Sequence, residues 1–354
     1  MGTASESVHS VIRLSELLDP EPSDLWTLIK QCGVDNVVAL LDGGEQQQRW
    51  LRADGANSGV PVSPERDAWS FGEINSIVER FRAHELHVVA IEDTPPMDGL
   101  RLGGPDAELQ MRQIHEQIVA MGQLGIPVLC YNWMIVTSWA RTATDIPARG
   151  GALTTGYRQT EADAAQFLLP PGAVTHEQLW TGLDRFLAAS LPVAEEAGVK
   201  LALHPDDPPL PSVRGVPRII SSLEAYRRIL SDHPSPSNCI TFCQGNFGLM
   251  TTDLRSAIAE FLPHIAFVHF RDVRGEATDF VETFHDDGPT DLAACMRLYV
   301  DAGYDGPMRP DHVPTMFGES NTRPGYATLG RLFALGYIRG LEHAVLSERL
   351  RAAG

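Results

Sequence analysis

Short apolar runs alternate with amphipathic stretches along almost all of this chain of 354 residues. Eight runs have the length and composition of buried β-strands, and they cover residues 11–14, 36–41, 87–93, 127–133, 200–204, 239–243, 265–269 and 306–311. Apolar residues at helical spacing occur at 73–84, 108–124, 176–197, 223–230, 254–262, 292–302 and 326–351. The alternation predicts a parallel sheet covered by helices, and eight β/α units predict a (β/α)8 TIM barrel.

An open, doubly wound sheet is the alternative fold, but no Gly-x-Gly-x-x-Gly motif follows an early strand to support a dinucleotide-binding version. We expect residues 1–354 to form one barrel domain, since barrels of this length are common. Residues 138–175 interrupt the alternation and are rich in Gly, Pro, Thr and Arg. Because they follow the fourth strand, we expect them at the active-site face, as a lid or as a surface excursion that contacts another subunit.

Charge and cysteine content indicate which partners the protein can bind and in which compartment it is found. The net charge of −18 argues against a nucleic-acid partner, which normally selects a basic surface. No apolar run approaches the roughly 20 residues of a membrane span, and residues 1–7 lack the character of a signal peptide. The five cysteines are odd in number and widely spread, unlike a disulfide framework. The sequence therefore predicts a soluble cytoplasmic protein that binds neither nucleic acid nor membranes.

Four of the predicted strands end in a residue able to bind a metal ion, namely His204, Cys243, His269 and Asp311. Strands of a parallel barrel deliver their C-terminal ends to one face, where residues distant in sequence converge. A single histidine or cysteine at a strand end is more often a packed side chain, but four such residues together favour a metal site. The sequence therefore predicts a metal centre at the mouth of the barrel.

Polar residues beside these ligands are candidates for substrate binding. Asp206 and Asp207 follow the first histidine in a proline-rich turn, and we assign Asp206 to the substrate; one of the pair could instead cap the turn or orient the histidine. Arg271 points to the same side of its strand as His269, so it could neutralise an anionic substrate or pair with a barrel carboxylate. Asn132 lies at the end of the fourth predicted strand and could bind a substrate hydroxyl.

Two residues near the end of the chain could transfer protons. His312 follows Asp311 directly, and adjacent residues at a strand end point to different sides, so His312 can act as an acid or a base. Alternatively, His312 is a further metal ligand or a donor to one. Tyr326 stands at the start of the last helical segment, where a tyrosine usually packs, and a phenol needs a strongly lowered pKa to act as a base.

Several short motifs follow one another along the chain: His-Pro-Asp-Asp-Pro-Pro from His204, Phe-Cys-x-Gly around Cys243, His-Phe-Arg from His269, Phe-x-Glu-x-x-His ending at His285, Gly-Tyr-x-Gly ending at Gly306, Arg-Pro-Asp-His ending at His312 and Pro-Gly-Tyr ending at Tyr326. In this order they resemble the mannonate dehydratase family of xylose-isomerase-like barrels. Tyr-Asn-Trp-Met from Tyr131 and Trp-x-Arg-Thr ending at Thr142 extend the resemblance. It covers most of the chain from about residue 91 onward.

The resemblance implies that the four strand-end residues hold a divalent metal, usually Mn2+, in a site whose thiolate would also accept Fe2+, Zn2+ or Co2+. It implies that His312 and Tyr326 form the proton-transfer pair, one removing the C2 proton and the other protonating the C3 hydroxyl as it leaves. The implied reaction converts D-mannonate to 2-keto-3-deoxy-D-gluconate and water, as in hexuronate catabolism. We expect a homo-oligomer, a dimer or a tetramer, that acts on a small sugar acid.

The chain departs from the family's pattern in four places. Residues 11–14 replace an aromatic Arg-Trp-Tyr-Gly opening, and Val313, Gly330 and Asn246 replace a glycine, an aspartate and a small hydroxyl residue. These differences predict an intact metal site beside an altered substrate pocket. A metal-dependent sugar isomerase or epimerase on the same barrel is therefore the nearest rival function. A barrel phosphodiesterase and an inactive metal-binding paralogue are more distant alternatives.

Overall fold

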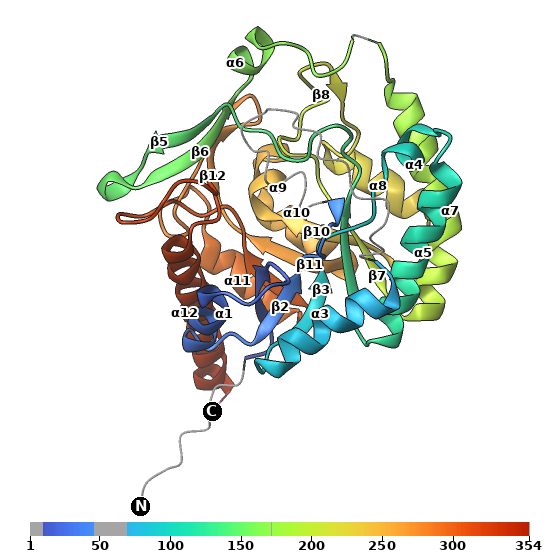
Figure 1. The fold of residues 1–354 in the computed structure, drawn as a ribbon. Helices are drawn as coiled ribbons and strands as arrows, with labels where there is room; N and C mark the ends of the chain where they lie inside the picture. The colour runs from blue at the N-terminus through green and yellow to red at the C-terminus, as the bar shows by residue number, and fades with distance from the viewer. Residues whose placement is uncertain (1–9, 46–68, 171, 354) are drawn as a thin grey trace, which may run out of the picture.

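The eight predicted strands close into a parallel barrel in the computed structural model of the protein, which describes residues 10–45, 69–170 and 172–353 (Figure 1). The barrel strands are β1 (Arg13–Leu18), β2 (Asn36–Ala39), β3 (His87–Ile91), β4 (Val128–Asn132), β7 (Lys200–His204), β10 (Asn238–Cys243), β11 (Ile265–Phe270) and β14 (Pro307–Pro310). Because β1 pairs in parallel with both β2 and β14, the sheet has no open edge. The (β/α)8 prediction is confirmed, and the open-sheet alternative is wrong.

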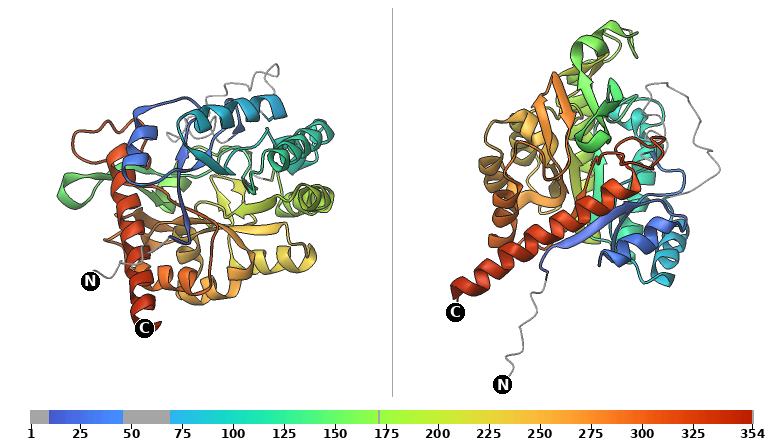
Figure 2. Two further views of the ribbon diagram at one scale, coloured as in Figure 1. Left: turned by 90° about the horizontal axis from the view of Figure 1, so that it is seen from below. Right: turned by 90° about the vertical axis from the view of Figure 1, so that its left-hand side faces the viewer.

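Helices cover the outside of the barrel, as Figures 1 and 2 show. They are α1 (Asp24–Gln31), α3 (Phe71–Ala83), α4 (Asp98–Leu102), α5 (Ala107–Gln123), α7 (His176–Ala197), α8 (Leu223–Asp232), α9 (Gln244–Met250), α10 (Leu254–Phe261), α11 (Leu292–Asp301) and α12 (Thr328–Ala353), with short 3-10 turns η1 (Arg149–Gly151) and η2 (Leu262–His264). Local sequence fixes their ends: Thr175 and Gln178 form a capping box at the start of α7, and Gly198 follows its last residue in the left-handed conformation.

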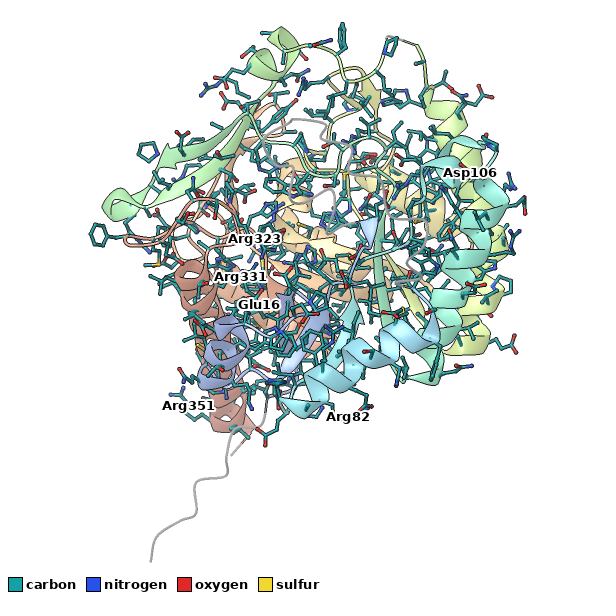
Figure 3. The ribbon with its side chains drawn as sticks, viewed as in Figure 1. Glu16, Arg82, Asp106, Arg323, Arg331 and Arg351 are labelled. Atoms are coloured by element: carbon teal, nitrogen blue, oxygen red, sulfur yellow. The ribbon has the colours of Figure 1, made fainter. Side chains whose placement is uncertain are left out.

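The first strand begins later and extends further than the sequence pattern predicts. The predicted run was 11–14, whereas β1 spans Arg13–Leu18 and includes Ser15 and Glu16, both almost fully buried. The nearest Glu16 carboxylate oxygen lies 3.8 Å from Arg331 on α12, and burial raises the pKa of the carboxyl (Figure 3). Polar residues inside the strand break the apolar pattern, which explains the wrong boundary.

Residues 138–175 are more regular than the sequence indicates. They contain β5 (Ala143–Pro147), β6 (Leu153–Arg158) and α6 (Gln159–Ala164). The two strands join β12 (Val273–Glu276) and β13 (Asp279–Glu282) in an antiparallel sheet of order β12-β13-β6-β5 beside the barrel (Figure 1). A small hairpin of β8 (Ser212–Val213) and β9 (Val216–Pro217) follows β7. The roles of lid and subunit contact remain predictions.

Two apolar layers organise the barrel. The larger one lies between strands and helices, and a second contains alternate strand residues such as Val38, Ala90 and Phe267. This second layer includes Trp139 and Tyr326, which bring it to the mouth of the barrel. Within the ranges that the structure describes, no helix is long and apolar enough to cross a membrane. Residues 1–7, on which the signal-peptide prediction depends, lie outside these ranges.

Candidate metal centre and proton-transfer residues

The four predicted ligands come together at the C-terminal ends of four strands. His204 ends β7, Cys243 ends β10, His269 lies near the end of β11, and Asp311 follows β14 directly. One ligand atom from each lies within 4.8 Å of the others. Oδ2 of Asp311 is 3.9 Å from Cys243 Sγ and 3.6 Å from His269 Nδ1. Residues separated by more than a hundred positions are thus close enough to share one ion.

The two histidines present ring nitrogens that suit a metal. His204 Nδ1 lies 2.7 Å from the Pro205 carbonyl, so it donates its hydrogen there and leaves Nε2 with a free lone pair. Both ring nitrogens of His269 are buried, and neither makes a hydrogen bond within the described residues. A buried imidazole without hydrogen bonds is costly, and coordination to a cation would satisfy it.

Electrostatics favour the anionic forms of the other two ligands. Burial opposes ionisation of Cys243, but Arg271 and the two histidines outweigh it and lower the pKa of the thiol to about 5. Burial likewise opposes ionisation of Asp311, but His312, Arg309 and His269 hold the pKa of that carboxyl well below its usual range. A thiolate and a carboxylate are therefore available at neutral pH, and with two imidazoles they form a donor set that fits a divalent transition metal.

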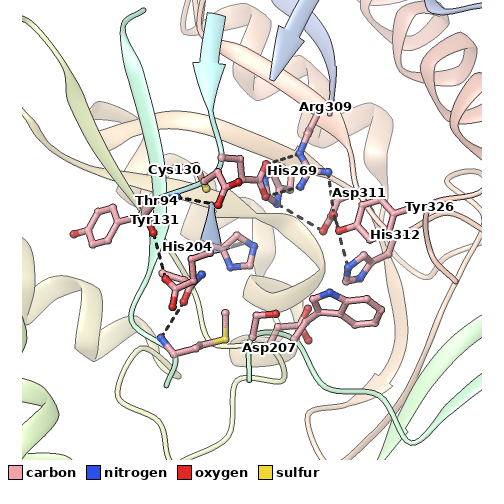
Figure 4. Close-up of a pocket in the computed structure, with 17 residues that line it drawn as sticks. Thr94, Cys130, Tyr131, His204, Asp207, His269, Arg309, Asp311, His312 and Tyr326 are labelled. Atoms are coloured by element: carbon pink, nitrogen blue, oxygen red, sulfur yellow. Dashed lines mark hydrogen bonds and ion pairs between the residues drawn. The ribbon is translucent and has the colours of Figure 1, made fainter. Parts of the chain in front are cut away.

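A buried arginine connects the metal-ligand cluster to the third strand. Nε and Nη2 of Arg309 donate to the Glu92 carboxylate at 2.9 and 2.7 Å, and Nη1 donates to Asp311 Oδ1 at 3.0 Å (Figure 4). Glu92 Oε2 lies 3.3 Å from His269 Nε2. Glu92, Cys130 and His269 also approach one another closely enough to bind an ion, but Arg309 occupies both oxygens of Glu92. Glu92 therefore fits better as the group that orients His269.

The two predicted proton-transfer residues lie beside this cluster (Figure 4). The rings of His312 and Tyr326 are perpendicular with centroids 5.4 Å apart, and Trp139 packs on both. The Tyr326 hydroxyl donates to Asp311 Oδ1 at 3.2 Å. Burial and the Asp311 charge raise the pKa of Tyr326 well above its usual value. His312 has a positive φ of 34°, an uncommon backbone conformation for a residue other than glycine.

A cavity opens onto these groups. Its walls include the ligands His204, His269 and Asp311, the pair His312 and Tyr326, and the polar residues Glu45, Glu92, Asp93, Asn132 and Asp207. Asn132 thus lies where the sequence predicts.

Two other predicted substrate residues lie behind the cavity wall. Asp207 lines the cavity, whereas Asp206 is buried and accepts a hydrogen bond from the Ile220 amide at 2.6 Å. Arg271 is fully enclosed and donates to Glu282, Asp207 and Asn246. The structure therefore brings Asn132 to the cavity but not Asp206 or Arg271.

The departures from the family pattern do not alter the described cavity wall. Asn246 is buried and accepts a hydrogen bond from Arg271 at 2.9 Å. A Cβ at Gly330 would lie 2.2 Å from the Pro314 carbonyl oxygen and 2.9 Å from Val313 Cγ2. The side chain of Val313 thus lies close to the space that a side chain at 330 would need. A valine at 313 therefore fits with a glycine at 330, because the two positions share one space. Neither residue supports the prediction of an altered substrate pocket.

Three charged residues with buried side chains at the site have no role predicted from the sequence, namely Arg141, Glu282 and Arg309. Each stands in a motif quoted above, so a signal was present. Their partners are distant in sequence, however: Arg141 contacts Glu282 across 141 positions, and Arg309 contacts Glu92 across 217. A single sequence provides no means of pairing them.

Comparison with known proteins places the chain in a family. The sequence profile of D-mannonate dehydratase (UxuA) matches residues 25–169 and 171–351. The mannonate dehydratase of Streptococcus equi subsp. zooepidemicus is 33% identical over 323 residues, covering 83% of this chain and 86% of that protein. That of Bacillus subtilis is 31% identical over 311 residues, covering 78% and 86%.

Solved structures agree with this assignment. The crystal structure of mannonate dehydratase from Streptococcus suis serotype 2 superposes with a TM-score of 0.83 at 28% identity, covering 96% of this chain and 95% of that one. An L-ribulose 3-epimerase reaches a TM-score of 0.57 at 14% identity over 97% and 98% of the chains, which shows a common fold only. The chain belongs to the mannonate dehydratase family.

Proposed function

We propose that the protein is a metal-dependent hydro-lyase that dehydrates D-mannonate to 2-keto-3-deoxy-D-gluconate. The observation that supports this most is the cluster of four metal-ligand side chains, three of which line one cavity together with His312 and Tyr326, in a chain of this family. Removal of a proton from C2 and of hydroxide from C3 requires a base, an acid and a means of stabilising charge on the carboxylate. The residues of the cavity can provide each of these.

His204, Cys243, His269 and Asp311 would hold the metal. When bound, a divalent cation supplies Lewis-acid stabilisation of the charge that develops on the substrate carboxylate. Manganese is the metal that we propose from the family resemblance, and two imidazoles, a thiolate and a carboxylate also suit iron, zinc or cobalt.

Tyr326 is the better acid and His312 the better base of the pair. Because its pKa is raised, the Tyr326 phenol keeps its proton at neutral pH and can donate it to the departing C3 hydroxyl. A ring nitrogen with a lone pair can accept a proton, so His312 removes the C2 proton. Asn132 is positioned to bind a substrate hydroxyl from the cavity wall.

The compartment and the assembly are further parts of the proposal. The five cysteines all lie within the described residues and form no disulfide, which agrees with a reducing compartment such as the cytoplasm. We retain the homo-oligomer, dimer or tetramer, and the place in hexuronate catabolism as predictions.

A substrate panel with metal analysis tests the proposal. The purified protein, with its metal content measured by mass spectrometry, is assayed for 2-keto acid formation from a set of aldonates and for isomerisation of free aldoses and ketoses. We expect turnover of D-mannonate, at a rate that follows the content of bound divalent metal. Turnover of free sugars instead would favour the isomerase or epimerase function, and metal binding without turnover would favour an inactive paralogue.

The variant His312→Asn separates chemistry from metal binding. Because His312 is not among the four ligands, metal content should stay at the wild-type level while turnover is lost. Unchanged turnover in this variant would refute the assigned role.

A further inference from the structure

Four charged side chains form a closed ring next to His312. Arg141 donates to Asp207 Oδ1 at 2.6 Å and to Glu282 Oε1. Arg271 donates to Asp207 Oδ2 at 3.1 Å and to Glu282 Oε2 at 2.8 Å. Each arginine thus contacts both carboxylates, and each carboxylate contacts both arginines. All four side chains are at most 1% exposed, so solvent hardly screens these contacts.

The ring joins segments that are far apart in the chain. Arg141 precedes β5, Asp207 lies in the turn after β7, Arg271 follows β11, and Glu282 ends β13. The antiparallel sheet outside the barrel therefore provides Glu282 from β13, and Arg141 lies just before its strand β5. The two positive and two negative charges balance, which allows the ring to be buried without excess charge.

His312 contacts the ring through one nitrogen. Its Nδ1 lies 2.9 Å from Glu282 Oε1 and 3.0 Å from Arg141 Nη2. Nη2 carries two hydrogens, and it already contacts carboxylate oxygens of both Asp207 and Glu282. No hydrogen of Nη2 remains for the imidazole, so Nδ1 carries the hydrogen and donates it to Glu282.

We propose that Glu282 is the positioning residue that fixes the tautomer and orientation of His312. With the hydrogen on Nδ1, the lone pair lies on Nε2, which is 3.8 Å from Asp311 Oδ1 on the side of the metal-ligand cluster. The ring holds Glu282 in place from two sides, and Trp139 packs against the imidazole. This inference rests on the proposed dehydratase function, because it explains how His312 presents a proton-accepting nitrogen to the substrate.

The variant Glu282→Gln tests this role. An amide can donate to Nδ1 as well as accept from it, so the histidine is free to take the other tautomer. We expect kcat to fall on the order of 10²- to 10⁴-fold, the range associated with loss of a correctly oriented general base, while KM and metal content stay within about threefold. Asp272→Asn is the matched control: Asp272 is a buried carboxylate that accepts from Val273 and Thr290, and this variant should keep kcat within about twofold.

A spectroscopic measurement makes the inference independent of activity. In the zinc-loaded, 15N-histidine-labelled protein, the His312 resonances are identified by their absence in His312→Asn. Wild type should show a protonated Nδ1 and an unprotonated Nε2, and Glu282→Gln should lose this pattern. An Nε2–H tautomer in wild type would overturn the inference, even if no aldonate is turned over and the proposed function itself fails.

The activity and folding of the Glu282 variants give further tests of the proposal. A folded Glu282→Gln protein with wild-type kcat would contradict the proposal, and so would a loss of activity that follows only from lost metal or a raised KM. If Glu282→Gln does not fold, Glu282→Asp keeps the charge of the ring and shortens the side chain by one methylene. That variant should show the same loss of kcat and of the tautomer signal.

Discussion

Three of the four metal-ligand side chains are held by a second group. His204 is held by the Pro205 carbonyl, Asp311 by Arg309 and Tyr326, and His269 lies against Glu92. Such supports orient ligands and tune their affinity for the metal. The ligands themselves were predictable because each ends an apolar strand. Their supports were not, because the contacts join distant parts of the chain.

Replacing Glu92 should weaken metal binding. In Glu92→Gln, His269 loses the neighbouring carboxylate and Arg309 loses a charged partner, so we expect the dissociation constant for Mn2+ to rise roughly 10- to 100-fold. Competition titration with a fluorescent chelator measures this. Glu342→Gln provides a buried control, since Glu342 accepts hydrogen bonds from the backbone amides of Val11 and Ile12. The affinity of this variant for Mn2+ should equal that of the wild type. Equal affinity in both variants would show that Glu92 has no such role.

His285 should make the stability of the protein depend on pH. Nε2 donates to the Phe270 carbonyl at 2.7 Å, and burial lowers the pKa of the imidazole to about 4. The unfolded chain, with a pKa near 6.5, binds the proton more readily, so the contribution is complete above about pH 6.5 and is lost as the pH falls toward 4. The full effect is about 3 kcal/mol. Urea unfolding from pH 7.5 to 4.5 should show less pH dependence in His285→Gln, and an identical dependence would contradict the assignment.

The sequence does not show which of two adjacent side chains in a turn reaches the cavity. Asp206 and Asp207 follow the same strand, and only the conformation of the turn decides which one reaches the cavity. Likewise, the alternation of β11 places Arg271 on the same side as His269, but it does not show that four buried partners, one of them Asp311, occupy the guanidinium. Side-chain direction was predictable in regular strands and not in the turns that follow them.

At the scale of elements, strands and helices with regular periodicity were predicted well. The outer sheet was missed because its strands are short and carry Gly, Thr and charged residues rather than an apolar alternation. Its pairing also joins residues 153–158 to residues 279–282, which no local pattern connects. This sheet delivers Glu282 to the mouth of the barrel, so the missed element bears directly on the site.

The first turn of α12 should not tolerate a side chain at Gly330. A Cβ there would meet the Pro314 carbonyl oxygen at 2.2 Å, so Gly330→Ala should destabilise the protein by about 1–3 kcal/mol. Gly336→Ala in the same helix is the matched control, because nothing lies within 4 Å of its added Cβ, and it should stabilise by about 0.5–1 kcal/mol. Val313→Gly should recover part of the loss in a double variant. Chemical denaturation measures all three, and equal effects at the two glycines would contradict the packing described.

In the whole molecule, the metal ligands lie at the ends of four neighbouring strands, since β7, β10, β11 and β14 are consecutive around the barrel. This arrangement follows from topology: parallel strands in a closed barrel have their C-terminal ends on one face, and sequence order becomes spatial order. The sequence therefore sufficed for the barrel and for the face that bears the site. Its first strand was placed inaccurately because buried polar residues interrupt the apolar pattern there.

An ion shared by four strands should stabilise the folded barrel. At a free metal concentration about 100 times the dissociation constant, binding adds about 2.7 kcal/mol to the free energy of unfolding. Thermal unfolding should thus occur at a lower temperature after chelation and recover on addition of Mn2+. Cys243→Ser is the comparison, and the shift should be smaller there because one ligand is weakened. Identical melting with and without metal in wild type would contradict a shared site.

Anomalous diffraction from crystals of the manganese-loaded protein tests the shared metal site most directly. We expect one strong anomalous peak within bonding distance of His204 Nε2, Cys243 Sγ, a ring nitrogen of His269 and a carboxylate oxygen of Asp311. A peak bound elsewhere, such as between Glu92 and Cys130, or the absence of any peak at these four side chains, would contradict it.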